Sequence, residues 1–108
     1  MKIKIKATNL KLTPAMENYI EEKMLMLEKF LGNQQVLNVA FEVEMTTKHH
    51  LKGEIFRAEV NLSLPGQLLR VEKTEKDLYK AIDKVKDHLA QQIVKYKEKL
   101  KDKERRQR

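Results

Sequence analysis

The sequence predicts an α+β domain with the element order β-α-β-β-β-α, in which two helices pack on one face of a four-stranded mixed sheet. Four stretches alternate apolar with polar residues, the pattern of strands that bury a single face. Two further stretches repeat apolar residues at helical spacing. Because every strand has only one apolar face, both helices are expected to cover the same side of the sheet.

The first strand and the first helix have clear local signals. Residues 2–7 alternate lysine with apolar residues, which predicts a half-buried strand. Thr13 is a favoured helix N-cap, and Pro14 suits the first helical position. Apolar residues then recur at helical spacing until Gly32, so one continuous helix is predicted from Pro14 to Gly32.

Two more strands follow, over residues 37–45 and 56–64, joined by the polar connection 46–54. The strands on either side of the first helix are expected to be parallel if they are adjacent, with a right-handed crossover. The last three strands are expected to form an antiparallel meander.

The fourth strand and the final helix complete the domain. Pro65-Gly66 predicts a turn, and Leu69 and Val71 suggest a short strand after it. The run 74–77 (Thr-Glu-Lys-Asp) resembles a capping box with Asp in place of Glu, so the final helix is predicted to begin there. Residues 1–101 are expected to form one domain, and residues 102–108 a basic, disordered tail.

The final helix carries most of the positive charge. Segment 73–108 has 13 Lys and Arg against 7 Asp and Glu, whereas the first 72 residues have 10 against 9. Its basic side spans roughly 28 Å at about 1.5 Å per residue, enough to contact several phosphates. A solvated helix back is the alternative interpretation. The members of this basic side are Lys80, Lys84, His88, Gln91, Lys95, Lys99 and Arg106.

Composition narrows the classes of partner. A pI of about 9.6 points to nucleic acid, an anionic membrane surface or an acidic protein. A membrane is disfavoured, because the apolar face of the final helix is needed for the core, and no run approaches the roughly 20 apolar residues of a membrane span. The chain has no cysteine and lacks the apolar block of a signal peptide at its start, which fits a cytoplasmic protein.

Two residues have two interpretations each. Lys23 falls inside the apolar stripe of the first helix, where it either extends its ammonium to water or extends the phosphate-binding surface from the groove between the helices. His88 lies on the basic side of the final helix, where it either donates to phosphate or is simply solvated.

Signatures of catalysis and of metal binding are absent from the sequence. The glycines are isolated, and Ser63 has no His/Asp pattern, so neither a phosphate-cradling loop nor a catalytic triad is predicted. His49-His50 predicts a surface loop rather than a metal site. Asp83 and Asp87 are expected to form ion pairs within the final helix. The predicted protein is therefore not an enzyme and needs no cofactor or metal.

Several motifs together resemble the ribosome hibernation promoting factors, a family that includes the ribosome-associated inhibitor and was formerly called sigma-54 modulation proteins. The resemblance covers essentially the whole chain in the same element order. The run 77–83 at the start of the final helix is its most specific part. The matching segments are Asn9-x3-Thr13, Tyr19-x3-Lys23-x3-Leu27-Glu28, Asp77-Leu78-Tyr79-x-Ala81-Ile82-Asp83 and Leu89-x2-Gln92-x2-Lys95-x-Lys97-x-Lys99.

This resemblance implies a stress factor that binds 16S-type rRNA in the decoding region of the small ribosomal subunit and blocks the channel used by mRNA and tRNA. It implies idle or dimerised ribosomes as the product. His88 and Gln91 stand where the family often has Lys and Arg, and Met26 where it often has Lys. The implied rRNA contacts are Lys23, Lys80, Lys84, Lys95, Lys97 and Lys99, with His88 and Gln91 on the same surface.

Alternatives remain open at the level of sequence. The predicted fold is close to that of double-stranded RNA-binding domains, so a general duplex-RNA module is one competitor. A protein-interaction domain that contacts an acidic partner through Leu25 and Leu51 is another. Long family members carry a further C-terminal dimerisation domain, so this chain is either a short-type factor or the first half of a long one. In isolation it is expected to be monomeric.

Overall fold

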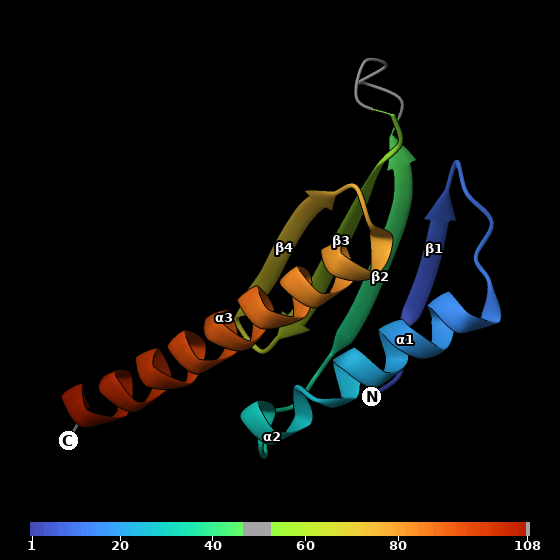
Figure 1. Cartoon of the computed structure of the whole chain (residues 1–108). Helices are drawn as coiled ribbons and strands as arrows, with labels where there is room; N and C mark the ends of the chain where they lie inside the picture. Colours follow the sequence, from blue (N-terminus) through green and yellow to red (C-terminus); the bar gives the residue numbers. More distant parts are fainter. Residues whose placement is uncertain (47–52, 108) are drawn as a thin grey trace.

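The structure, a computed structural model, describes residues 1–46 and 53–107. It confirms the predicted α+β architecture: the strands form one mixed sheet in the order β1-β2-β3-β4, with the helices on one face (Figure 1). β1 pairs with β2 in parallel, and β2, β3 and β4 form the antiparallel meander. The elements are β1 (Lys4–Thr8), α1 (Pro14–Leu25), α2 (Glu28–Leu31), β2 (Asn38–Thr46), β3 (Ile55–Leu64), β4 (Gln67–Glu75) and α3 (Leu78–Arg106).

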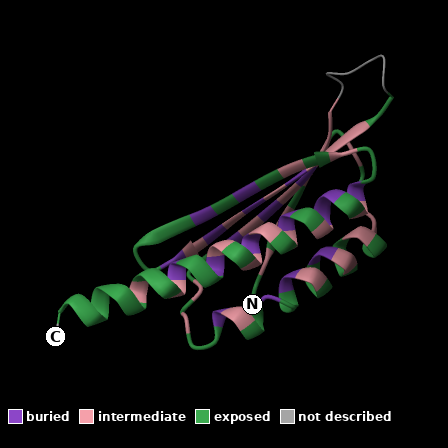
Figure 2. Ribbon diagram, turned by 60° about the vertical axis from the view of Figure 1, so that its left-hand side comes forward, coloured by how far each residue is buried: buried purple, intermediate pink, exposed green. Residues whose placement is uncertain are grey.

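The core lies between the sheet and the helices, where the alternation of the sequence predicts it. Phe41 on β2 is opposite Val60 on β3, which in turn is opposite Val71 on β4. All three side chains are buried and share one core cluster with Leu89 and Ile93 of α3. Figure 2 shows the buried residues alternating along the strands and following one side of the helices. A rigid, apolar base therefore supports α3 along the sheet.

Thr13 caps α1 as predicted, since its hydroxyl accepts a hydrogen bond from the Met16 amide at 3.2 Å. The prediction of one continuous helix as far as Gly32 was wrong. The Leu27 amide bonds to the Met24 carbonyl, only three residues back, at 3.0 Å. This tighter turn separates α1 from the one-turn α2 and lies beside the fully buried Leu27. Gly32, at φ 57°, then ends α2.

The fourth strand is longer than predicted, and the final helix begins later. Thr74 and Glu75 lie in β4 opposite Arg57 and Phe56, because β3 is long enough to pair with the first two residues of the segment that resembled a capping box. Asp77 is the actual N-cap of α3, and its carboxylate accepts a hydrogen bond from the Tyr79 amide at 2.9 Å. Strand pairing therefore overrides the local helix-start signal at Thr74.

The end of α3 extends past the sheet, and its residues are exposed (Figure 2). We expected residues 102–108 to be disordered, whereas in the structure the helix continues to Arg106. Beyond Leu100 no residue packs against the core cluster among the residues described, and Arg105 lies 4.0 Å from Asp102 one turn earlier. This end of α3 is therefore held by local interactions alone, and we expect its amides to exchange with solvent fastest in the helix.

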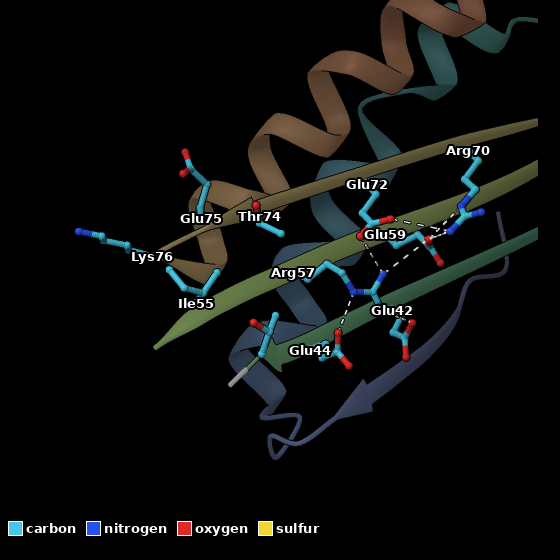
Figure 3. A pocket seen from close by; sticks show the side chains of 11 residues that line it. Glu42, Glu44, Ile55, Arg57, Glu59, Arg70, Glu72, Thr74, Glu75 and Lys76 are labelled. Atoms are coloured by element: carbon cyan, nitrogen blue, oxygen red, sulfur yellow. Dashed lines mark hydrogen bonds and ion pairs between the residues drawn. The ribbon is translucent and has the colours of Figure 1, made fainter. Parts of the chain in front are cut away.

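The sheet face away from the helices carries an ion-pair network centred on Arg57 and lines a hollow of about 800 Å³ (Figure 3). The Arg57 guanidinium lies 2.5 Å from Glu42 and 2.8 Å from Glu44, and it is also within 3.8 Å of Glu59 and Glu72. These glutamates therefore neutralise the positive charge of Arg57 within the protein. The centre of this hollow offers no free cation to an anionic partner, whereas the exposed Lys76, which also lines the hollow, has no acidic partner within 4.0 Å among the described residues.

Acidification tests this network. The Thr8 hydroxyl donates to Glu42 at 2.8 Å, and this bond, together with Arg57, lowers the pKa of Glu42 from its ordinary value of 4.5. A carboxyl with a lowered folded pKa stabilises the fold above about pH 4.5, and that contribution is lost as the pH falls through the folded pKa. Acidification below pH 4.5 lowers the unfolding free energy of wild type. In Thr8→Val this decrease is therefore expected to be smaller by about 1 kcal/mol, as measured in urea titrations. Identical pH profiles for the two proteins would contradict the role of this bond.

Candidate nucleic-acid interface

The helix α3 is fixed over the sheet by its apolar side and by two polar contacts to the β4 region. The Tyr96 hydroxyl donates to the Pro65 carbonyl at 2.9 Å, and the Gln92 amide donates to the Arg70 carbonyl at 3.4 Å. The predicted apolar stripe is confirmed, because its members from Leu78 to Tyr96 are buried. One flank of α3 is consequently held along β4, the edge strand of the sheet.

That flank and β4 enclose a polar, basic groove. One hollow in it is lined by Lys73 of β4 together with Lys84, Asp87, His88 and Gln91 of α3. A second hollow contains His88 again, with Lys95 and Lys99 further along the helix. We call this surface the α3–β4 groove, defined by Lys73, Lys84, His88, Gln91, Lys95 and Lys99. Lys80 is exposed one helical turn before Lys84 and continues the same row.

The lysines of this row differ in whether an acidic side chain pairs with their ammonium group. Lys84 pairs with Glu75 of β4, and this contact lowers the pKa of Glu75. Lys80, Lys95 and Lys99 are exposed and have no acidic partner within 4.0 Å among the described residues. Among the described residues, three ammonium groups with no acidic partner within 4.0 Å therefore lie along about 28 Å of one helix, which favours a polyanionic ligand.

The structure places two of the predicted residues on the opposite flank of α3. Lys97 donates to the Phe30 carbonyl of α2 at 2.9 Å. Lys23 of α1 lies 3.3 Å from Asp83 of α3. The eight residues predicted from sequence thus form two groups: Lys80, Lys84, His88, Gln91, Lys95 and Lys99 on the β4 side, and Lys23 and Lys97 on the side of α1 and α2.

The expectation for the aspartates was right for one and wrong for the other. Asp87 pairs within α3, with Lys86 at 2.6 Å. Asp83 instead accepts a hydrogen bond from Tyr19 and pairs with Lys23, both of which belong to α1. Spacing along one helix does not reveal such a contact, because the partner comes from an element more than fifty residues away.

Sequence reasoning also missed Lys73. Its side chain shares the helix-facing parity of Leu69 and Val71, which placed it on the same side of the predicted strand. This alternation was the sequence signal that could have identified Lys73 as a residue on the helical side of the sheet. The lysine reaches the groove because β4 continues to Glu75 instead of ending before the helix.

Other candidate features are limited in what they contribute. Among residues 1–46 and 53–107, no group of His, Cys, Asp and Glu is arranged to hold a metal ion. No helix in this part of the chain is long and apolar enough to cross a membrane. Leu25 is 52% exposed, while His49, His50 and Leu51 lie outside the described residues.

Comparison with solved structures supports the fold. The N-terminal domain of Protein Y from Thermus thermophilus superposes with a TM-score of 0.75 at 30% identity, covering 89% of this chain and 99% of that one. A ribosomal subunit interface protein from Coxiella burnetii gives a TM-score of 0.71 at 22% identity, covering 90% and 98% of the two chains. The second likeness concerns the fold alone.

Curated relatives agree with this likeness. The ribosome hibernation promoting factor of Klebsiella oxytoca is 32% identical over 94% of this chain and 98% of its own length. The ribosome hibernation promotion factor of Staphylococcus aureus is 34% identical over 97% of this chain, and that of Deinococcus radiodurans is 33% identical over 82%. The chain spans about half the length of these last two proteins, 53% and 45% respectively.

The family model described as sigma 54 modulation protein / S30EA ribosomal protein matches residues 3–101, which include every strand and nearly all of the helical structure. The matched range contains both flanks of α3 and the whole α3–β4 groove. With this match and a relative 32% identical over almost its entire length, the chain belongs to the sigma 54 modulation protein / S30EA ribosomal protein family.

Proposed function

We propose that this protein is a ribosome hibernation factor that binds the small ribosomal subunit through the α3–β4 groove and the adjoining Lys80. The observation that carries the proposal is a row of exposed lysines on a rigidly supported helix, with no acidic partner within 4.0 Å in the described part of the chain: Lys80, Lys95 and Lys99. Membership of the family and the names of three curated relatives support the ribosome as the particle bound. Catalysis has no part in this function.

The ligand in this proposal is 16S-type rRNA in the decoding region, within the channel that mRNA and tRNA use. Occupancy of that channel blocks translation by steric exclusion and stabilises idle or dimerised ribosomes. Lysine ammonium groups contact backbone phosphates and release counterions, which supplies affinity without reading base sequence. We assign phosphate contacts to the six predicted residues on the β4 side and to Lys73, which shares the groove with Lys84 and His88.

The open face of the sheet does not compete for this role. The charge of its central Arg57 is neutralised by ion pairs with glutamates. Phe41 is buried in the core, so it does not form an aromatic platform for bases. Recognition is therefore assigned to the helical side of the molecule. The protein acts as a cytoplasmic monomer without a cofactor in this proposal.

A chemical footprint on isolated small subunits tests the location. Protection of rRNA is expected in the decoding region, and it should disappear when mRNA and initiator tRNA are added together. Protection elsewhere, or protection that survives both competitors, would contradict the steric-block proposal.

Two controls separate the alternative functions. A general duplex-RNA module would bind free double-stranded RNA as tightly as subunits, so a hairpin duplex serves as the competing ligand. A protein-interaction module using the exposed Leu25 would remain in its complexes after RNase treatment. Our proposal predicts weak binding to the free duplex and loss of the complexes on RNase treatment.

A further inference from the structure

His88 lies at the centre of the α3–β4 groove, because it is the residue that the two hollows of the groove share. Its side chain is half-buried. Among the described residues, its imidazole makes no hydrogen bond and has no acidic partner within 4.0 Å. Both hollows contain lysines as well: Lys73 and Lys84 in one, and Lys95 and Lys99 in the other. The ring is therefore placed to contact a ligand that occupies the groove.

A stretch of α3 within the groove has no permanent positive charge. It runs from Lys84 to Lys95, roughly 16 Å at about 1.5 Å per residue. The residues of α3 that line the groove between these two lysines are Asp87, His88, Gln91 and Gln92. Only His88 among them can acquire a positive charge. Protonation of His88 therefore decides whether the cationic row of the helix is continuous across the middle of the groove.

The surroundings of His88 couple its protonation to the binding of an anion. Imidazole changes its charge between about pH 5 and 8, where lysine and arginine stay charged. The charged and titratable groups that line the groove around the ring are Arg70 and Lys73 of β4 and Lys84, Asp87, Lys95, Tyr96 and Lys99 of α3. The cations oppose a further positive charge in the free protein, and Asp87, which would favour it, pairs with Lys86 at 2.6 Å. A phosphate in the groove reverses this balance, so RNA and the proton each strengthen the binding of the other.

We propose that His88 is a pH-sensitive phosphate contact, through which the protein binds rRNA more tightly as the solution becomes more acidic. The protonated imidazole donates to a phosphate oxygen from a ring nitrogen and closes the interval between Lys84 and Lys95. The neutral ring leaves that interval uncharged and the complex weaker. The inference rests on the proposed function, because its ligand is the phosphate backbone of the rRNA.

The affinity for small subunits at about pH 8 and about pH 6 tests this contact, since imidazole titrates between these values. Wild type is expected to bind roughly twofold to fivefold more tightly at the lower pH, the range typical of one partly exposed ion pair. Its slope of log affinity against log potassium chloride concentration should steepen by up to about 0.9. His88→Gln, which stays neutral, should bind as wild type does at pH 8 under both conditions. His88→Lys, which stays charged, should bind tightly under both.

Two comparisons identify the titrating group. The chain has three histidines, and the double variant His49→Gln/His50→Gln removes the other two. This variant is expected to keep the pH response of wild type. A response that is equal in wild type and His88→Gln, or no gain in affinity from His88→Lys at pH 8, overturns the inference while RNA binding by the lysines stands. A wild-type affinity that ignores salt at both pH values overturns the proposed function as well.

Proton uptake provides a second readout that does not depend on comparing affinities. Calorimetric titration of small subunits in buffers of different ionisation enthalpy counts the protons bound when the complex forms. Near neutral pH, wild type is expected to take up a measurable fraction of one proton more than His88→Gln, because the phosphate favours the charged ring. Equal proton uptake by the two proteins would overturn the inference. Equal melting temperatures check that the substitution leaves the fold intact.

Discussion

Replacement of Lys80, Lys95 and Lys99 together by glutamate is expected to abolish cosedimentation with small ribosomal subunits at moderate salt. The three side chains are exposed and lack acidic partners within 4.0 Å among the described residues, so the fold should be retained. Loss of three phosphate contacts alone reduces the salt slope by about 2 to 3, and the new carboxylates add repulsion. Lys84 is left intact because its ammonium pairs with Glu75.

A matched control separates position from net charge. Lys2, Lys4 and Lys11 are also exposed, and their replacement by glutamate changes the formal charge of +7 by the same amount. This variant is expected to pellet with subunits nearly as wild type does, since these lysines lie away from α3. Normal pelleting of the α3 variant, or equal loss by both variants, would show that the α3–β4 groove and Lys80 do not form the binding surface.

Leu89→Ala is expected to produce the largest loss of stability. Leu89 is a fully buried residue of α3 and belongs to the core cluster that supports the groove. Truncation of a buried leucine costs about 2–5 kcal/mol, against a total stability of about 5–15 kcal/mol for a typical domain. The melting temperature should fall by roughly 10–20 °C, as measured by circular dichroism.

Val94→Ala is the control for this experiment. Val94 lies on the same helix but is 40% exposed, so its truncation is expected to change the unfolding free energy by less than about 0.5 kcal/mol. Equal losses at Leu89 and Val94 would contradict the proposed packing of α3 on the sheet. Well below its melting temperature, Leu89→Ala should keep the wild-type salt slope, because it removes no charge.

The fold was largely predictable because its strands bury one face each. Alternation over residues 37–45 and 56–64 located two strands and identified the side that the helices cover. The errors occurred where pairing or packing competes with local signals. Thr74 has the character of a helix cap but pairs with Arg57 in the sheet, and burial of Leu27 coincides with the break between α1 and α2.

The candidate site was predictable only in part, because sequence reports which residues share a helix face but not what faces them. The spacing of Lys80, Lys95 and Lys99 was sufficient to align them on one flank. The hydrogen bond from Lys97 to the Phe30 carbonyl and the pairing of Lys23 with Asp83 depend on how α1 and α2 dock against α3. The position of Lys73 in the groove depends on the full length of β4, which the sequence did not predict.

The affinity for small subunits as a function of potassium chloride concentration tests the central claim most directly. If the lysines of α3 bind rRNA phosphates, log affinity falls linearly with log salt, with a slope of about −0.7 to −0.9 for each phosphate contacted. Six or more contacts would lower the affinity by roughly a thousandfold or more between 50 and 200 mM salt. An affinity that stays constant across this range would contradict the assignment of the basic flank of α3 as the RNA-binding surface.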